Sequence, residues 1–160
     1  MSDVVELKKS ADRFDPMALS GRALLQAIVD GELPPPPFAG TTCIKLTGVG
    51  EGRVVFTGMP EQAFLNPLGT IHGGWIATII DSALGCAVHS MLKPGQTYTT
   101  TAMTVHYVRA LKPDSGEVRC EGVAVHTGRR TATSEARLVD SKGRLIAHGS
   151  ESCLIMDIAE

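Results

Sequence analysis

The sequence predicts an α+β fold in which a single antiparallel sheet curls round one long helix. Apolar residues recur with helical spacing over positions 75–91, and small residues occupy much of the rest, which is typical of a helix buried on nearly all sides. A pair of short strand-like segments precedes this helix, and four longer ones follow it, most of them joined by tight turns. Strands joined in this way pair antiparallel, so we expect one sheet that encloses the helix.

The N-terminal part of the chain, residues 1–40, is expected to be an extension of a sheet domain that covers residues 41–160. Within the extension, Ser20 can cap a short helix that ends near Gly31. The prolines at positions 34–37 predict a stiff extended connector. The short helix carries an apolar stripe formed by Leu24, Leu25, Ile28 and Val29. Because this stripe must be buried, we expect the helix to cover the open edge of the sheet or the mouth of a pocket.

The sheet domain is expected to open with a hairpin, whose arms lie near residues 42–46 and 53–57 around a glycine-rich turn. Residues 59–74 contain two prolines and three glycines, and they predict a long loop before the central helix. The four later strands are predicted at residues 98–110, 117–126, 130–139 and 145–156. Two of the turns between them are of hairpin length, with glycine placed for positive φ.

Length, charge and composition exclude several function classes. A chain of 160 residues is expected to form one domain. Fifteen Lys and Arg stand against 17 Asp and Glu, and only 4% of the residues are aromatic, so neither nucleic acid nor an anionic membrane is an expected partner. The N-terminus lacks the pattern of a signal peptide, and no apolar run is long enough to cross a membrane. We therefore expect a cytoplasmic protein.

The spacing of cysteine and histidine argues against a metal site. The cysteines lie dozens of residues apart without a CxxC pair, which is typical of reduced thiols rather than of zinc ligands or disulfides; they are Cys43, Cys86, Cys120 and Cys153. The five histidines also lack the short spacing of paired ligands. We expect no metal and no bound cofactor.

The candidate chemistry lies in the loop and helix between Asn66 and Asp81. Gly73 and Gly74 at the start of the helix leave backbone N–H groups uncovered, and these can polarise a carbonyl or hold an anion. Asp81 is the only carboxylate of the predicted helix, and in apolar surroundings it must be paired, protonated or functional. The Asn66 amide could orient a water or bond the glycine loop. Each feature alone is also compatible with ordinary turns and a solvated Asp; together they predict a site.

The motif Asn66-(x5)-His72-Gly73-Gly74-(x6)-Asp81 resembles the signature of hotdog-fold acyl-CoA thioesterases, most closely the PaaI-like branch that is related to 4-hydroxybenzoyl-CoA thioesterases. The order of elements is similar too, and the resemblance extends over residues 41–155. It implies a hotdog fold and hydrolysis of a medium-chain or aryl acyl-CoA to the free acid and CoA. Coenzyme A is then part of the substrate and product, and no separate cofactor is implied.

The same resemblance implies roles for individual residues. The Gly73 N–H would polarise the thioester carbonyl, and Asp81 would act as nucleophile or as the general base on a water. Asn66 would position the water or the carbonyl group, and His72 would brace the loop through its ring. A Ser or Thr early in the strand after the helix is common in the family. Thr100 is the favoured match, although successive threonines also simply favour strands.

Helix geometry adds an expectation about assembly. Eight residues separate Gly73 from Asp81, a distance of about 12 Å along the helix axis. A carboxylate that far away cannot easily serve a carbonyl held at the N-terminus of its own helix, so the two groups should come from different copies of the chain. We expect an obligate homodimer with two sites at its interface, or a homotetramer of such dimers, as in similar thioesterases.

Several further residues are candidates for substrate binding. Arg129 and Arg130 follow a turn glycine, and Arg109 lies at the end of a predicted strand, so each could hold phosphates of coenzyme A, although a solvated hairpin tip is equally compatible. Gly74 belongs to the same helix start as Gly73. Trp75, directly after it, could line the acyl pocket or simply pack.

Two other functions stay open at this stage. Hydratases and dehydratases that act on acyl thioesters share the fold, but they pair a His with an acid that both reach the acyl chain, and no second pair of that kind is evident. A non-catalytic acyl-CoA binding or sensor protein would keep the helix N-terminus and the pocket, but it would not need Asp81. The presence of Asp81 favours the thioesterase.

Overall fold

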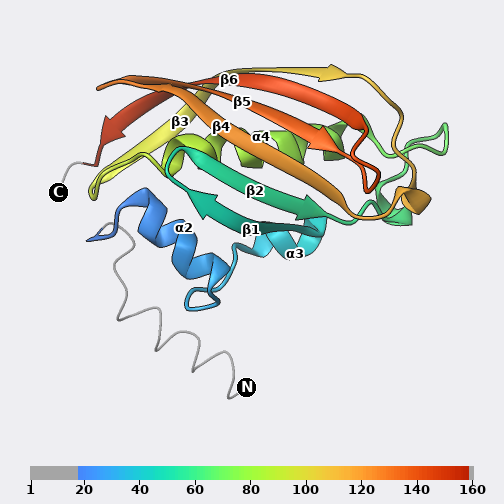
Figure 1. Cartoon of the computed structure of the whole chain (residues 1–160), viewed down its shortest axis with the longest axis horizontal. Helices are drawn as coiled ribbons and strands as arrows, with labels where there is room; N and C mark the ends of the chain where they lie inside the picture. The colour runs from blue at the N-terminus through green and yellow to red at the C-terminus, as the bar shows by residue number, and fades with distance from the viewer. Residues whose placement is uncertain (1–17, 159–160) are drawn as a thin grey trace.

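The structure, a computed structural model, describes residues 18–158, and its main feature is a six-stranded antiparallel sheet curled round helix α4 (Gly73–His89) (Figure 1). The order of strands across the sheet is β1-β2-β4-β5-β6-β3. The strands are β1 (Ile44–Gly50), β2 (Arg53–Gly58), β3 (Gln96–Tyr107), β4 (Val118–Thr127), β5 (Thr131–Val139) and β6 (Leu145–Asp157). The predicted α+β architecture is confirmed.

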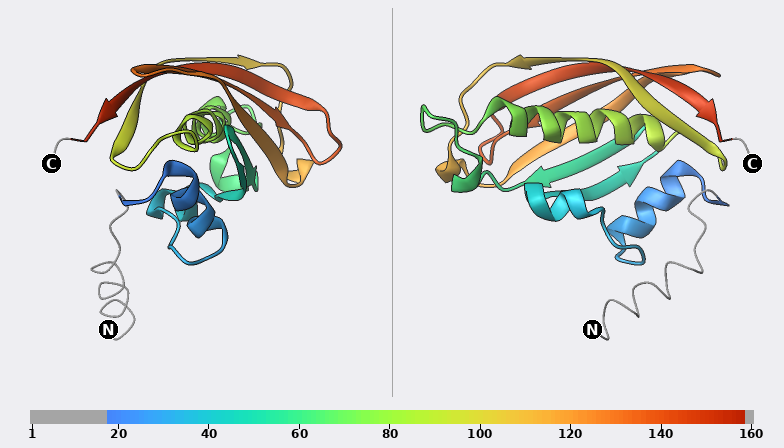
Figure 2. Two further views of the ribbon diagram at one scale, coloured as in Figure 1. Left: turned by 60° about the vertical axis from the view of Figure 1, so that its left-hand side comes forward. Right: turned by 180° about the vertical axis from the view of Figure 1, so that it is seen from behind.

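Helix α4 is buried because it is apolar or small on nearly every side. Six of its residues have no exposed surface: Ile79, Ile80, Ala83, Leu84, Ala87 and Val88. The curved sheet covers it, as Figure 2 shows in end view, and strand β4 passes so close that a Cβ on Gly122 would collide with the Ala83 carbonyl. A residue without a side chain is therefore required at that crossing.

From residue 18 onward, the N-terminal extension and the residues that follow it form two short helices, α2 (Gly21–Val29) and α3 (Pro37–Thr42). Ser20 caps α2 as predicted, because its Oγ accepts a hydrogen bond from the N–H of Ala23 at 3.3 Å. Leu25 of this helix joins the main hydrophobic core. Helix α2 packs against β1, which is one edge of the sheet, and it also lines a cavity described below.

The proline connector and the first strand differ from the prediction. The segment 34–37 is not extended throughout, because Pro37 begins α3, and the fixed φ of proline is favourable at the first position of a helix. Cys43 then ends α3 in a left-handed conformation with φ of 54°. As a result β1 begins at Ile44, two residues later than expected.

The bounds of two further elements, α4 and β3, also differ from the prediction. Helix α4 begins at Gly73 rather than at 75, because His72 caps it, and it ends at His89 rather than at 91. Strand β3 ends at Tyr107 rather than at 110. Beyond it, the N–H groups of Val108 and Arg109 both donate to the carbonyl of Ile146, at 2.8 and 3.1 Å, which ends the regular ladder.

Strand β3 stands out as an uncovered edge. It has 12 residues, its one strand partner within residues 18–158 is β6, and most of its side chains are exposed on both faces. Strand β5, in the middle of the sheet, alternates strictly between exposed and buried residues over most of its length. The contrast indicates that both faces of β3 lack the cover that the rest of the sheet receives.

Candidate active site

The N-terminus of α4 is organised by short-range hydrogen bonds. The ring Nδ1 of His72 accepts from the Gly74 N–H at 2.8 Å, and the backbone N–H of His72 donates to the carbonyl of Phe64 at 2.8 Å. The Gly73 N–H has no acceptor within residues 18–158. The uncovered donor at this helix end is therefore the N–H of Gly73.

The loop before the helix is closed by Asn66. Its Oδ1 accepts from the N–H groups of Leu68 and Thr70, at 2.9 and 3.2 Å, and its Nδ2 donates to the Thr70 hydroxyl at 2.9 Å. An asparagine amide carries two N–H donors, so one of them is left for another acceptor. Asn66 thus holds the loop and still offers one donor.

Tyr107 at the end of β3 covers Gly73. Its hydroxyl donates to the Gly73 carbonyl at 3.1 Å, and its ring lies where a Cβ on Gly73 would be in ordinary contact. The two residues line a cavity of about 220 Å³ together with Arg109 and the Ile71 and Ile76 side chains. The structure therefore brings Arg109 to the Gly73 end of the helix.

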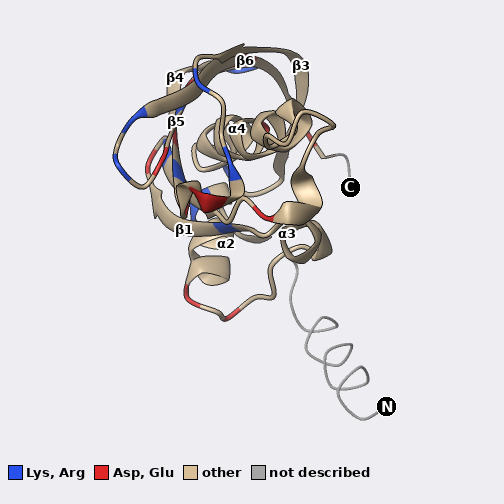
Figure 3. Ribbon diagram, turned by 90° about the vertical axis from the view of Figure 1, so that its right-hand side faces the viewer, with Lys and Arg blue, Asp and Glu red and all other residues tan. Residues whose placement is uncertain are grey.

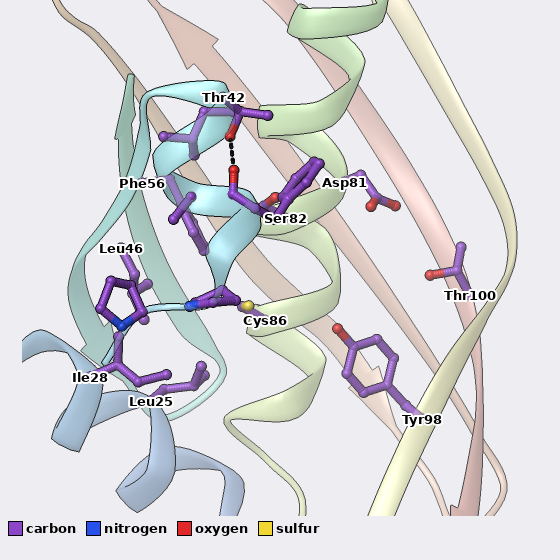
Figure 4. A pocket seen from close by; sticks show the side chains of 15 residues that line it. Leu25, Ile28, Thr42, Leu46, Phe56, Asp81, Ser82, Cys86, Tyr98 and Thr100 are labelled. Atoms are coloured by element: carbon purple, nitrogen blue, oxygen red, sulfur yellow. Dashed lines mark hydrogen bonds between the residues drawn. The ribbon is translucent and has the colours of Figure 1, made fainter. Parts of the chain in front are cut away.

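A second cavity, of about 300 Å³, lies beside Asp81. Its walls come from α2, α3, β1, β2, α4 and β3, and most of the lining side chains are apolar. Figure 4 shows Asp81 and Thr100 directed toward one another from α4 and β3, with the Tyr98 ring close by, and the apolar residues of the extension on the other side. The lining contains no Lys or Arg.

The surroundings of Asp81 make its charged form less favourable than it is in water. Asp81 is accessible on the exposed face of α4, yet partial burial of its carboxyl group raises its pKa. One helical turn and a residue further on, burial and then the charges of Asp81 and Glu151 raise the pKa of the Cys86 thiol to about 12. Cys86 is therefore an uncharged wall of the cavity, and Asp81 is the group in it that can act as a base.

Thr100 is fixed by a residue that sequence reasoning missed. Its hydroxyl donates to Oε1 of Glu151 on β6 at 2.8 Å, and Glu151 is only 2% exposed. The signal was present in the sequence, because alternation along the strand places Glu151 on the same face as Gly149 and Cys153, where an apolar residue is expected. Tyr107 was missed as well.

Space for Tyr98 depends on a glycine of the helix. A Cβ on Gly85 would collide with the Tyr98 hydroxyl, so the ring can lie against α4 only because Gly85 has no side chain. Burial raises the pKa of Tyr98 well above its ordinary value. The phenol therefore stays neutral beside the Asp81 cavity.

The predicted residues fall into two groups. The first lies at the N-terminus of α4 and consists of Asn66, His72, Gly73, Gly74 and Arg109. The second lies at Asp81 and Thr100. Arg130 is on the far side of β6 from this group, because its carbonyl accepts from the N–H of Ile155, the residue of β6 that pairs with Tyr98 of β3. The two groups are separated by about 12 Å of helix. One chain therefore does not bring Gly73 and Asp81 together.

Trp75, Arg129 and Arg130 lie outside both groups of residues. Trp75 is 6% exposed, stacks on Phe64 with 5.6 Å between ring centroids, and donates from Nε1 to the Thr42 carbonyl at 2.8 Å. It packs rather than lining the Asp81 cavity. Arg129 and Arg130 are both exposed at the turn between β4 and β5. Lys and Arg residues lie on several strands and loops around α4, whereas α4 itself contains neither (Figure 3).

Within residues 18–158, no cluster of three or more His, Cys, Asp or Glu side chains is arranged to hold a metal ion. The helices of that same part of the chain are all too short or too polar to span a bilayer.

Comparison with known proteins identifies the family. The model of the thioesterase superfamily matches residues 68–147, which is half of the chain and includes Gly73, Asp81 and Thr100. No curated protein matches the chain in sequence.

Three solved structures illustrate the similarity. A phenylacetic acid degradation-related protein from Ralstonia eutropha is 24% identical, with a TM-score of 0.74 over 81% of this chain and 98% of its own. A mutant of the phenylacetic acid degradation protein PaaI from Thermus thermophilus is 28% identical, with a TM-score of 0.67 over 74% and 98%. A hypothetical thioesterase protein from Streptococcus pneumoniae, solved with coenzyme A, is 25% identical, with a TM-score of 0.66 over 73% and 88%. This chain is therefore a hotdog-fold thioester hydrolase and belongs to the thioesterase superfamily.

Proposed function

We propose that the protein hydrolyses acyl-CoA at a site shared by two protomers. The observation that carries this proposal is the separation of the two groups along α4. Asp81 opens into one cavity and Gly73 into another, and about 12 Å of helix lies between them. A second copy of the chain, with its helix alongside, supplies the missing half of each site.

The proposed reaction uses Asp81 on one side of the thioester and the partner subunit's Gly73 on the other. Asp81 removes a proton from a water, and the water oxygen bonds to the thioester carbon. The carbonyl oxygen gains charge in this step and is stabilised by the partner's Gly73 N–H. The C–S bond then breaks, and the CoA thiolate leaves and takes up the proton. Direct attack by Asp81 would use the same groups, with the water consumed in a second step.

The uncovered edge of the sheet supports association with a second copy. Along the 12 residues of β3, the N–H and C=O groups that point away from β6 have no strand partner in the described part of the chain, and most of the side chains are exposed. Pairing of β3 with β3 of another copy would complete these hydrogen bonds. It would also bring a second helix next to Asp81, whose position on α4 faces the same side as β3 in Figure 4.

The cavity beside Asp81 supports the acyl-group part of the proposal. Its volume of about 300 Å³ is roughly twice that of an engineered apolar cavity that binds benzene. Helices α2 and α3 close its far end with Leu25, Ile28 and Phe38. A medium-chain or aryl acyl group has the size and the apolar surface for such a space.

The arginines provide candidate contacts for coenzyme A. Arg109 lies beside the cavity at Gly73, and Arg129 and Arg130 lie at the turn next to the Thr100 end of the sheet. In a dimer, Arg109 from one protomer and the turn of the other would flank the same site. Guanidinium groups bind phosphates well, so these side chains are the proposed anchors for the nucleotide.

The first experiment measures release of free CoA thiol from short, medium, long and aryl acyl-CoAs. For the medium-chain or aryl substrates we expect turnover by the natural protein and a loss of at least roughly a hundredfold in Asp81→Asn, which keeps the shape but removes the base. Asp114→Asn, an exposed position in another loop, is the matched control and should leave turnover unchanged.

Other outcomes would point elsewhere. Tight binding of acyl-CoA without turnover in both proteins would favour a binding or sensor protein. Addition or removal of water on the acyl chain, without release of thiol, would favour a hydratase. Equal hydrolysis by the natural protein and Asp81→Asn would show that the carboxylate has another role.

A further inference from the structure

Glu151 is a buried carboxylate that takes no part in the proton transfer or the carbonyl stabilisation of the proposed reaction. It lies on the inner face of β6 and is 2% exposed. Its Oε1 accepts hydrogen bonds from the Thr100 hydroxyl at 2.8 Å and from the Cys153 thiol at 2.9 Å. Its Oε2 is buried without a partner in the described part of the chain. A carboxylate with one unsatisfied oxygen is costly to bury, and such groups are concentrated at functional sites.

The backbone also directs Thr100 toward this carboxylate. Thr100 pairs with Cys153 on β6, but Ala102 pairs with Ser152, so Thr101 is an additional residue in β3. This irregularity is a β-bulge, a feature that changes the direction of side chains and is common beside active sites. The Thr101 hydroxyl bonds to the Ser152 carbonyl at 2.9 Å and secures the bulge.

The remaining groups around Glu151 do not neutralise it. Asp81 and Cys86 face it from α4, Tyr98 from β3 and Cys153 from its own strand, and none of these carries a positive charge. Burial, and then the charge of Asp81, raise the pKa of Glu151. Strand β5 places Ser134 directly opposite, and its buried Oγ likewise lacks a partner among residues 18–158.

We propose that Glu151 is a positioning residue that holds the hydroxyl proton of Thr100, so that the Thr100 oxygen can only accept a hydrogen bond from the attacking water. This inference rests on the proposed function. A hydroxyl has one donor and two acceptor positions, and the Glu151 bond uses the donor. The two protons of the water then point at Asp81 and Thr100, and a lone pair of the water oxygen is left to face the thioester carbon. No proton is transferred to Glu151.

The test is a double-mutant cycle between Glu151 and Thr100, measured as thiol release. Glu151→Leu frees the Thr100 hydroxyl, and we expect kcat to fall roughly tenfold to a hundredfold with KM nearly unchanged. Thr100→Val should cause a similar loss. Both changes remove the same hydrogen bond, the one between Thr100 and Glu151. Glu151→Leu should therefore have almost no further effect on kcat in a Thr100→Val background. Cys153→Ala removes the other hydrogen bond to Oε1 and should keep kcat within about threefold of the natural protein.

Glu151→Gln provides an independent readout, including the case in which the Leu variant does not fold. The amide oxygen still accepts from Thr100, so kcat at the optimum pH should stay within about fivefold of the natural value. Loss of the Glu151 charge stabilises ionised Asp81, so the acid limb of the kcat/KM profile should move to lower pH.

Three results would overturn the inference. One is a loss of kcat on Glu151→Leu that is equally large in the natural protein and in the Thr100→Val variant. Another is a Gln variant as impaired as the Leu variant, with an unmoved acid limb. The third is full activity in Glu151→Leu. If the natural protein hydrolyses acyl-CoA in an Asp81-dependent way while any of these is observed, only the role of Glu151 fails. If neither hydrolysis nor dependence on Asp81 is found, the proposed function and this inference fail together.

Discussion

The two ends of the candidate site on α4 are built in opposite ways. At the N-terminus the candidate group is a backbone N–H, and its surroundings are set by contacts between near neighbours in sequence, such as Asn66 with Thr70 and His72 with Gly74. In the middle of the helix the candidate group is the Asp81 side chain, and its surroundings come from β3, β6 and the N-terminal extension. A local sequence motif can therefore define one half of the site, whereas only the complete fold defines the other.

The largest effect is expected from removing the donor at the N-terminal end. Gly73 is the first residue of α4, where proline is well tolerated, and His72 before it has the extended conformation that a following proline requires. Gly73→Pro deletes the N–H while preserving the helix, so we expect kcat to fall roughly a hundredfold to a thousandfold. Melting temperature and thiol release from acyl-CoA are measured together, and Gly73→Ala, which keeps the N–H, is the control.

A dimer that combines an Asp81→Asn chain with a Gly73→Pro chain tests whether Asp81 and Gly73 of one site come from different protomers. In a mixed dimer of Asp81→Asn and Gly73→Pro chains, one site carries both lesions and the other carries neither. Co-production of the two inactive chains should therefore restore about a quarter of the natural activity, given random pairing of subunits. No recovery in a verified mixed dimer would place both groups in one protomer's site and contradict the shared arrangement.

A smaller effect is expected from filling the far end of the Asp81 cavity. Ile28 on α2 lines the cavity, so Ile28→Trp should lower kcat/KM for the largest accepted acyl group by roughly tenfold or more while sparing the shortest. Val29 is the next residue of the same helix and does not line the cavity, so Val29→Trp is the matched control. An equal loss of kcat/KM for acyl groups of every length would show that helix α2 does not select the acyl group.

The smallest effect is expected at the loop before α4, where bracing and substrate contact can be separated. Asn66→Asp keeps the acceptor for the Leu68 and Thr70 N–H groups, and its second oxygen can accept from the Thr70 hydroxyl in place of the Nδ2 donation, but the free N–H donor is lost. We expect roughly a several-fold to tenfold loss of kcat with little change in melting temperature. Unchanged activity in Asn66→Asp, with a lower melting temperature in Asn66→Ala, would mean that Asn66 only holds the loop.

The same contrast explains what the sequence could and could not predict. The sheet, the central helix and the Gly73 end follow from periodicity and from a motif whose members are close in sequence. Glu151 meets Thr100 across 51 residues and Tyr107 meets Gly73 across 34, so no local pattern pairs them. The start of α3 at Pro37 was missed because proline is read as a helix breaker, although it is favourable at a first helical position.

The exposed edge of β3 also has a consequence for the survival of the protein in solution. Along this 12-residue strand, the N–H and C=O groups that point away from β6 have no strand partner among residues 18–158, and Met103 and Tyr107 are partly exposed beside them. An edge of this kind is a template for any other strand, including those of unrelated unfolded chains. In the proposed dimer, pairing of β3 with β3 would also cover this edge, and by mass action the fraction of chains with a bare edge would fall as the protein becomes more concentrated. With that arrangement, each chain would be most exposed to mispairing in the interval between its folding and its pairing with a second copy.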